Sequence, residues 1–350
     1  MSDRFYSTVH RCLIIVLFFS LVGIKAQSIR YAGELMHLPI GCRTVGLGNA
    51  SVALDGMGNS SYWNPALAAL SDLRFGIVEG ARLYEGLSDF GSVAAYTPVQ
   101  NGLVMGALYS AFFSGDITEW DSLPGTKRER EASWQENRHL YEGEGIFHNN
   151  QHVIVATVAK TFSLPIPRPS GFSTPMPVDI SAGLNFKYYW QTITPEDKVR
   201  MGMNVNVDVG AALQVGVDYD LNAKQISRKV IIGASVRNAL PTEVVWMHSY
   251  QDYTEPVDYC VLYGISYSDQ TGFLWADWTL SLSVKRLYTS TVQAGIEGVF
   301  WDCVAIRAGI DDKCPTFGAG LRIKMFSFDY AFSFDEVTYS PLRLSLGVQF

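Results

Sequence analysis

Most of the chain after Leu70 alternates between apolar and polar residues with a period of two. From Met201 to Asp218 the odd positions are Met, Val, Ala and Leu, whereas the even positions are Gly, Asn, Asp, Ala and Gln. Because successive side chains of a β-strand point to opposite faces, this pattern predicts strands with one apolar and one polar face. The segments Leu274–Lys285 and Leu342–Phe350 repeat the alternation.

The alternation predicts about fourteen strands, most of them nine residues or longer, which matches the 9–11 residues of a tilted membrane-spanning strand. The expected spans are 73–80, 88–97, 101–112, 150–162, 178–191, 201–218, 228–237, 257–268, 273–285, 289–299, 302–310, 315–324, 326–334 and 341–350. The weakest boundary is near Met325, where the apolar phase slips from odd to even positions. A tight turn there gives an even number of strands, and a β-bulge is the alternative.

A period of two does not by itself separate a membrane barrel from a soluble β-sandwich. Both have strands with one apolar and one polar face, but the apolar face points outward to lipid in a barrel and inward to the core in a sandwich. The polar face of this chain consists mainly of small residues, and aromatic residues gather at predicted strand ends: Tyr188, Tyr189, Trp190, Phe300 and Trp301. Such aromatic girdles are typical of outer-membrane barrels. We therefore expect an all-β fold, a transmembrane antiparallel β-barrel over residues 72–350, with Val207 and Leu282 facing lipid and Asn206 and Ser281 facing the lumen. A secreted soluble β-protein stays as the alternative.

The first 26 residues form a separate region. Arg4 and Arg11 precede an apolar run from Cys12 to Ile24, and the small residue Ala26 follows it. This order is typical of a secretory signal peptide, and the run is shorter than the roughly 20 residues of a spanning helix. We therefore expect residues 1–26 to be cleaved and the protein to reach the bacterial outer membrane. An N-terminal membrane anchor is the alternative.

Charge and motif content narrow the function. The 350 residues carry 27 Lys and Arg against 34 Asp and Glu, a net charge of −7, which argues against a nucleic-acid partner. No Ser/His/Asp or paired-carboxylate pattern stands out, and His148 and His152 lie at a loop–strand edge where they do not converge on a metal. We therefore expect no enzymatic activity, no cofactor and no metal.

Connection lengths predict the topology. The long connections Ser114–His148 and Asn238–Pro256 are expected outside the cell, and the short turns Pro98–Gln100 and Asp269–Gly272 in the periplasm. The Pro-rich connection Ser163–Pro177 is the long exception on the periplasmic side. An even number of strands places both termini in the periplasm.

Residues 29–71 are built differently from the strands and carry a family resemblance. They contain A-G-E-L at 32–35, G-C-R-T-V-G-L-G-N-A at 41–50 and S-Y-W-N-P-A at 61–66. This resembles the N-terminal hatch of the PorV/FadL group of outer-membrane barrels, although Cys42 and Leu47 depart mildly from its usual Ala and Met. The resemblance falls on Arg43, Gly46, Gly48, Ala50, Trp63, Asn64, Pro65 and Ala66. Further on, residues 233–240 and 304–330 resemble late strands of the PorV branch.

The residues themselves also predict that this segment is a plug. Irregular backbone cannot face lipid, where each unpaired polar group costs several kcal/mol. A barrel of about fourteen strands has room inside for a plug, since eight strands already fill with side chains. We therefore expect residues 27–71 to form a lumenal plug, with Gly46 and Gly48 close to the wall and Asn64–Pro65 in a rigid turn. These residues either hold the plug in place or also contact a substrate.

Two functions fit such a barrel. The resemblance to FadL implies passive uptake of hydrophobic small molecules through a plugged lumen. The resemblance to PorV implies association with components of the type IX secretion system. A purely structural outer-membrane protein is a further alternative. In each case the expected partners include outer-membrane lipids and the outer-membrane assembly machinery.

The C-terminal residue gives a first testable prediction. Phe350 ends a strand of strict alternation and resembles the terminal aromatic that the assembly machinery recognises. Deletion of Phe350 should lower the amount of folded barrel in the outer membrane while leaving export across the inner membrane intact. Heat-modifiability of the protein in membrane fractions measures this, and unchanged levels of folded barrel would argue that Phe350 is only one more girdle residue.

Overall fold

The computed structural model describes residues 33–54, 59–71, 74–119, 145–166, 176–194, 199–220, 225–247, 253–334 and 342–350. The predicted signal peptide, the start of the predicted plug and the charged centre of the connection after the third strand lie outside these residues.

Fourteen of the described strands form a closed antiparallel barrel, as the alternation predicts. Its closing pairs are β5 with β6 and β1 with β16, and Ile77 of β1 lies between Ala94 of β2 and Gly347 of β16. The barrel strands are β1 (Phe75–Leu83), β2 (Ser88–Gln100), β3 (Leu103–Glu119), β4 (Gly145–Ile166), β5 (Met176–Thr194), β6 (Arg200–Asp220), β7 (Gln225–Arg237), β10 (Cys260–Asp269), β11 (Ala276–Arg286), β12 (Ser290–Phe300), β13 (Val304–Asp311), β14 (Cys314–Ile323), β15 (Phe326–Ser333) and β16 (Arg343–Gln349).

The boundary near Met325 is a tight turn and not a bulge. Ile323 pairs directly with Phe326, so Lys324 and Met325 form a two-residue hairpin turn. Lys324 has a φ of 54°, which suits such a turn. At the C-terminus, the Phe350 amide donates to the Arg74 carbonyl at 2.9 Å and the Phe350 side chain is exposed. The first and last strands therefore meet at the end of the barrel where the chain ends.

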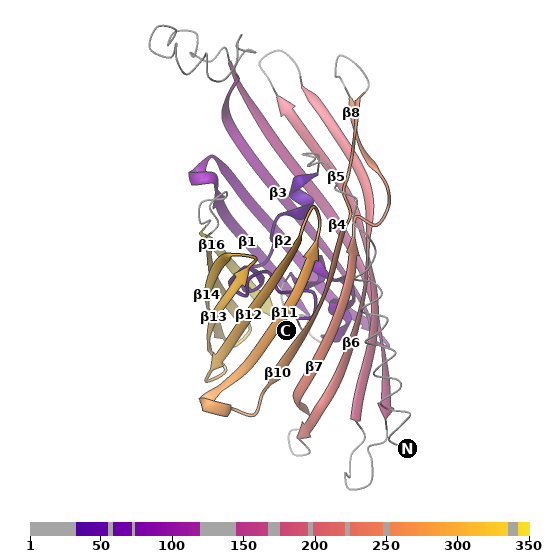
Figure 1. The fold of residues 1–350 in the computed structure, drawn as a ribbon, viewed down its shortest axis with the longest axis vertical. Coiled ribbons are helices and arrows are strands. Elements are labelled where there is room, and N and C mark those ends of the chain that lie inside the picture. The colour runs from indigo at the N-terminus through magenta and orange to yellow at the C-terminus, as the bar shows by residue number, and fades with distance from the viewer. Residues whose placement is uncertain are drawn as a thin grey trace. The chain divides into compact units, whose positions relative to one another are not determined.

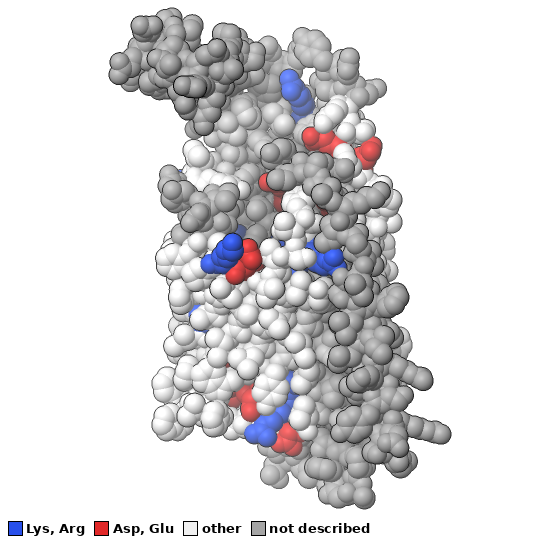
Figure 2. Space-filling model, viewed as in Figure 1, with Lys and Arg blue, Asp and Glu red and all other residues white. Residues whose placement is uncertain are grey.

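The faces of the strands are placed as the alternation predicts. In β6 the side chains of Asn206 and Asp208 are buried, whereas Val205 is 61% exposed. In β11 Ser281 is buried and Leu282 is 48% exposed. In these two strands apolar side chains therefore face outward and polar ones inward, which is the arrangement of a membrane barrel. On the face seen in Figure 2, charged side chains gather near the two ends of the shorter strands and few lie between them.

The aromatic girdle is only partly as expected. Tyr188 and Trp190 lie on the outer face, where Trp190 stacks on His152 with ring centroids 4.7 Å apart. Tyr189 was expected in the girdle, but its side chain is fully buried and faces inward. The reason is the strand period, since three consecutive residues of one strand cannot share a face. The Tyr189 hydroxyl instead donates to Gln151 at 3.0 Å.

The barrel wall is uneven in height (Figure 1). Strands β3 to β6 have 17 to 22 residues, whereas β11 to β16 have 7 to 11. Because β6 extends beyond its pairing with β7, its edge at Met201–Met203 is free to pair with another strand. The strand β8 (Glu243–Met247) occupies this edge and forms a hairpin with β9 (Tyr253–Pro256). The sequence predicted only a loop here, because a five-residue and a four-residue strand carry little alternation.

Besides turns and irregular connections, the described chain also contains short helices. They are η1 (Glu34–His37), α2 (Cys42–Gly46), α3 (Ser60–Trp63), η2 (Pro65–Leu70), η3 (Tyr84–Gly86) and η5 (Phe273–Trp275). None of the helices in the described ranges is long and apolar enough to cross a membrane. The strand expected at 273–285 begins only at Ala276, because the helix η5 occupies its first residues. Within η5, Leu274 has a positive φ of 54°, which is not an extended conformation.

The outward face of β11 gives a second prediction. Leu282→Arg places a charge near the middle of the lipid-facing side and should destabilise the folded barrel by about 2–4 kcal/mol, whereas Leu282→Met should cost little. Thr291→Arg is an inward control, because Thr291 lines an internal cavity beside Asp311 and Asp312. Urea titration of folding into lipid vesicles measures all three. Equal destabilisation by the two arginine variants would contradict the assignment of the faces.

Candidate functional site

The residues that resemble the hatch motifs lie in the N-terminal segment, by which we mean residues 33–54 and 59–71. This segment packs against inward-facing residues on both sides of the barrel: η2 contacts β4, β5 and β6, and α2 contacts β13, β14 and β15. In Figure 1 the indigo helices of the segment lie between the front and back strands. Tyr62, Trp63 and Asn64 are almost completely buried. The segment and the wall around it are therefore the candidate functional site.

Glycines let the segment approach the wall. A Cβ atom added to Gly210 of β6 would lie 2.1 Å from the Asn64 Oδ1 atom, and one on Gly295 of β12 would lie 2.4 Å from the Leu47 carbonyl oxygen. From the segment side, Gly48 has a φ of +63° and its Cβ would lie 2.4 Å from the Ile310 carbonyl oxygen. Gly46 lies against the Cα atom of Gly318. Glycines on both partners are thus required by the close packing at these points.

Asn64 and Pro65 form a turn that is bonded to the wall. Asn64 caps η2 by accepting a hydrogen bond from the Ala66 amide at 3.1 Å, and Pro65 occupies the first position of that helix. The Asn64 amide group also donates to the Val52 carbonyl at 2.8 Å and to the Ala211 carbonyl of β6 at 3.1 Å. The neighbouring Trp63 donates from its indole to the Ile40 carbonyl at 3.1 Å. One asparagine therefore links two parts of the segment to the barrel.

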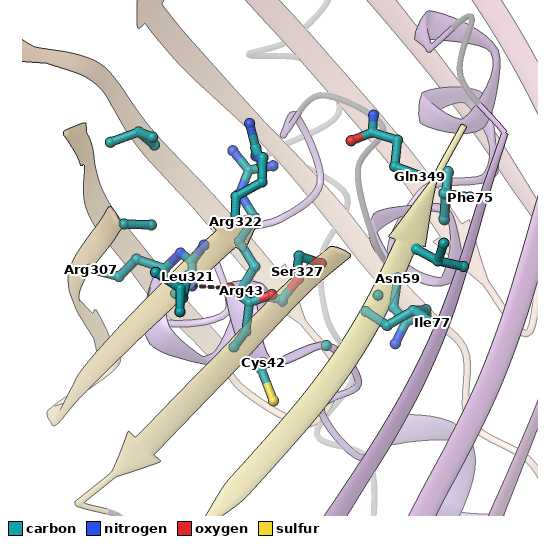
Figure 3. Close-up of a pocket in the computed structure, with 18 of the residues that line it drawn as sticks. Cys42, Arg43, Asn59, Phe75, Ile77, Arg307, Leu321, Arg322, Ser327 and Gln349 are labelled. Atoms are coloured by element: carbon teal, nitrogen blue, oxygen red, sulfur yellow. Dashed lines mark hydrogen bonds and ion pairs between the residues drawn. The ribbon is translucent and has the colours of Figure 1, made fainter. Parts of the chain in front are cut away.

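Arg43 joins the segment to a chain of charged groups on β12, β13 and β15. Its guanidinium bonds Glu297 at 2.7 Å, Glu297 also bonds Arg307 at 2.5 Å, and Arg307 bonds Asp329 at 2.6 Å. Breaking a buried ion pair by removing one partner typically costs about 3–5 kcal/mol, so this chain holds α2 firmly. Figure 3 shows Arg43 and Cys42 among the strands that line a small pocket of about 70 Å³ at this side of the segment.

A second ion pair holds the chain just before α2. Glu79 of β1 bonds Arg343 of β16 at 3.2 Å, and both are buried. Glu79 also accepts from the Gly41 amide at 2.7 Å, and Arg343 donates to the Pro39 carbonyl at 2.7 Å. The pair therefore binds the segment through backbone groups that would otherwise be unsatisfied.

A third group of charges surrounds η1 and α3. Arg237 of β7 stacks over the rings of Tyr62 and Trp63, with its guanidinium carbon 4.1 and 4.8 Å from the ring centroids. Nearby, Lys187 of β5 forms a buried ion pair with Asp208 of β6 at 2.5 Å. No catalytic or metal-binding motif in the sequence marks Arg237, Lys187 or Asp208. Each of these three is a charged residue at an inward position of a predicted strand. A charge at an inward position is therefore the sequence signal that points to them.

His37 lies at the edge of this third group. Its Nε2 atom is 3.3 Å from the Asn238 amide nitrogen, and Asn238 also bonds Lys187 and the Asp258 carbonyl. Burial, together with the positive charges of Arg237, Lys285 and Lys187, holds the pKa of His37 well below its ordinary range. His37 is therefore neutral at neutral pH.

Two cavities lie on the other side of the segment from the Figure 3 pocket. The larger, which we call the outer cavity, has a volume of about 600 Å³ and lies between η1 and β2, β3 and β4. The smaller has a volume of about 300 Å³ and borders β11, β12 and β13. Leu38 contributes to both. Most of the outer cavity's bulky lining is apolar: Leu35, Leu38, Tyr84, Leu87, Phe112 and Ile117.

Comparisons with known proteins give weak structural similarities. No family model matches the chain, and no curated protein matches its sequence. The toluene transporter TbuX of Ralstonia pickettii is 9% identical with a TM-score of 0.49, and the toluene transporter TodX of Pseudomonas putida is 10% identical with a TM-score of 0.45. Each comparison covers 89% of this chain and 97% of the other. The transport unit of the Escherichia coli autotransporter AIDA-I is 8% identical with a TM-score of 0.36, over 79% of this chain and 88% of that one.

The contact between Gly210 and Asn64 gives a third prediction. Gly210→Ala should displace Asn64 and loosen the segment, at a cost of about 1–3 kcal/mol for the overpacking. Gly80→Ala is the matched control, because its added Cβ would come no closer than 3.9 Å to another atom. Limited proteolysis of the segment in folded barrels measures the loosening. Equal protease resistance of the two variants would show that the segment does not press on β6.

His37 gives a fourth prediction. Its pKa in the folded protein lies below the ordinary value of 6.5, so its contribution to stability is complete above pH 6.5 and decreases as the pH falls toward the folded pKa. Lowering the pH from about 7.5 to about 5 should therefore make the segment more sensitive to protease. His37→Gln should weaken this pH response. His152→Gln, on the outer face, should keep it. If His37→Gln keeps the full pH response of protease sensitivity, groups other than His37 cause that response.

Proposed function

We propose that this protein is a bacterial outer-membrane channel for the passive uptake of hydrophobic small molecules, with the N-terminal segment as the plug of its lumen. The observation that carries the proposal is the outer cavity, an apolar space of about 600 Å³ between the segment and the wall. Its volume lies in the range of small-molecule sites, which are mostly apolar with a few polar groups. The apolar side chains on the outer face of the barrel, such as Val205 and Leu282, support a membrane location.

The plug role is supported by how the segment is held. Two buried ion-pair groups, centred on Glu297 and on the Glu79–Arg343 pair, bind the segment to the barrel wall. Asn64 adds a hydrogen bond to β6. A molecule that crosses the barrel must pass this segment, so transport requires at least part of it to shift. The outer cavity then holds a molecule before that step.

The second candidate function is association with the type IX secretion system. It is supported by the similarity of residues 233–240 and 304–330 to the PorV branch. The β8–β9 hairpin also favours it, because β9 pairs on one edge only among the described strands. A free strand edge is a template for a strand from a partner. Loss of cargo secretion in cells that carry a barrel without residues 243–256, with uptake of hydrophobic molecules unchanged, would favour this candidate.

The plug role gives a fifth prediction. Removal of residues 27–71 should leave a folded barrel with a raised conductance, because the wall strands bond one another around the closed barrel. Asn64→Ala should raise conductance less, since it removes one bond to the wall and one helix cap. Planar-bilayer recordings of the purified proteins measure both. Near-zero conductance of the shortened barrel, with its heat-modifiability intact, would mean that another part of the chain closes the lumen.

A further inference from the structure

The outer cavity has an apolar side and a polar rim. The rim consists of side chains at the ends of β2, β3 and β4, together with the first turn of η1: Glu34, Ser88, Ser114, Thr118, Asn149 and Gln151. Tyr84 and Phe112 lie edge to face on the apolar side, with ring centroids 6.2 Å apart. The cavity therefore suits a molecule with an apolar body and one polar group.

The uncharged part of the rim is held by its own hydrogen bonds. Gln151 accepts from the Leu35 amide at 3.2 Å and from the Tyr189 hydroxyl at 3.0 Å, both with its carbonyl oxygen. Its amide nitrogen is then the group left to donate to a ligand. Ser88 donates to Ser114 at 2.9 Å, so these two hydroxyls are also oriented. The Gln151 amide can therefore donate to a hydroxyl or carbonyl group of a ligand, and the two serine hydroxyls can accept from a ligand hydroxyl.

Glu34 contributes a negative charge to the cavity. Among the described residues that line it, Glu34 is the one ionisable carboxyl, and it makes no ion pair with any described residue. Partial burial raises the pKa of Glu34 above its ordinary value of 4.5. Glu34 keeps an exposed surface, so it repels a second carboxylate brought into the same space, and solvent screens part of that repulsion.

The described residues that line the smaller cavity supply no net positive charge to offset Glu34. Lys285 and Arg343 line it, but so do Asp311 and Asp312. Arg343 is already paired with Glu79 at 3.2 Å. Without Arg343, the described charged residues that line this cavity are Lys285 against Asp311 and Asp312, so a hydrophobic anion that spans both cavities meets no net positive charge there.

We infer that Glu34 is the specificity-determining residue of the outer cavity: it makes the cavity favour uncharged hydrophobic molecules that carry a hydroxyl or carbonyl group over hydrophobic anions of the same length. This inference rests on the proposed uptake function, because it requires the outer cavity to bind a hydrophobic molecule. It goes beyond that function by naming the chemical class of the molecule.

The test compares 1-decanol with decanoate, which differ in charge and share a chain length. Each competes with a fluorescent alkyl probe on the full-length protein in lipid nanodiscs at about pH 8, where both carboxyl groups are ionised. Empty nanodiscs measure partitioning into the lipid. Wild-type protein should bind 1-decanol more tightly than decanoate. Glu34→Gln should tighten decanoate binding about two- to fivefold and leave 1-decanol binding unchanged, the range expected for an exposed charge interaction.

The controls separate the two proposals. Asp302→Asn removes a carboxylate from the exposed turn between β12 and β13, far along the chain from the outer cavity, and should leave both affinities unchanged. If neither 1-decanol nor decanoate binds wild-type protein beyond its partitioning into empty nanodiscs, the proposed uptake function fails and the inference fails with it. If both bind wild-type protein equally, or if Glu34→Gln leaves their ratio unchanged, the inference alone is overturned and the uptake function stands.

Discussion

The buried charges on the inward face of the wall are the constraint on which the structure depends. Lipid outside the barrel admits neither charge nor unpaired backbone, so the strands direct their polar residues inward. Those residues then need hydrogen-bond or ion-pair partners inside the barrel. The N-terminal segment contributes partners at three places: Arg43 bonds Glu297, the Gly41 amide bonds Glu79, and the Met36 carbonyl accepts from Arg237. The segment thus adds partners to wall groups that also pair with one another, as Glu297 does with Arg307 and Glu79 with Arg343.

The segment fits because the wall has small residues where the two meet. Glycines stand in directly paired positions on neighbouring strands, such as Gly183 opposite Gly210 and Gly295 opposite Gly309. The uneven height of the wall leaves the space for the outer cavity, since β3 and β4 extend beyond the level of η1 while the opposite strands are short. The segment therefore packs closely against the wall on one side and borders free space on the other.

The sequence predicted the barrel well because strand alternation reports which face is buried. It gave the number of barrel strands, their approximate spans, the turn at Met325 and the inward position of Asn206. It missed β8 and β9, because their pairing depends on the free edge of β6 and not on their own pattern. The position expected for Tyr189 is wrong, because the expectation followed its aromatic neighbours Tyr188 and Trp190 and not the period of two along the strand. The hatch motifs identified Arg43, Gly48 and Asn64, but their partners on the wall are up to 268 residues away and no local pattern reveals such pairs.

Crosslinking tests most directly whether the N-terminal segment lies against the inner wall of the barrel. The Asn49 amide lies 2.7 Å from the Asp311 carboxylate of β13. In a cysteine-free background with a protease site inserted between residues 71 and 74, the pair Asn49→Cys and Asp311→Cys should crosslink in intact membranes and keep the two fragments joined after cleavage. The pair Asn49→Cys and Asp302→Cys should not. Fragments that separate in the first pair, from barrels that remain folded, would contradict a segment bound to the inner wall.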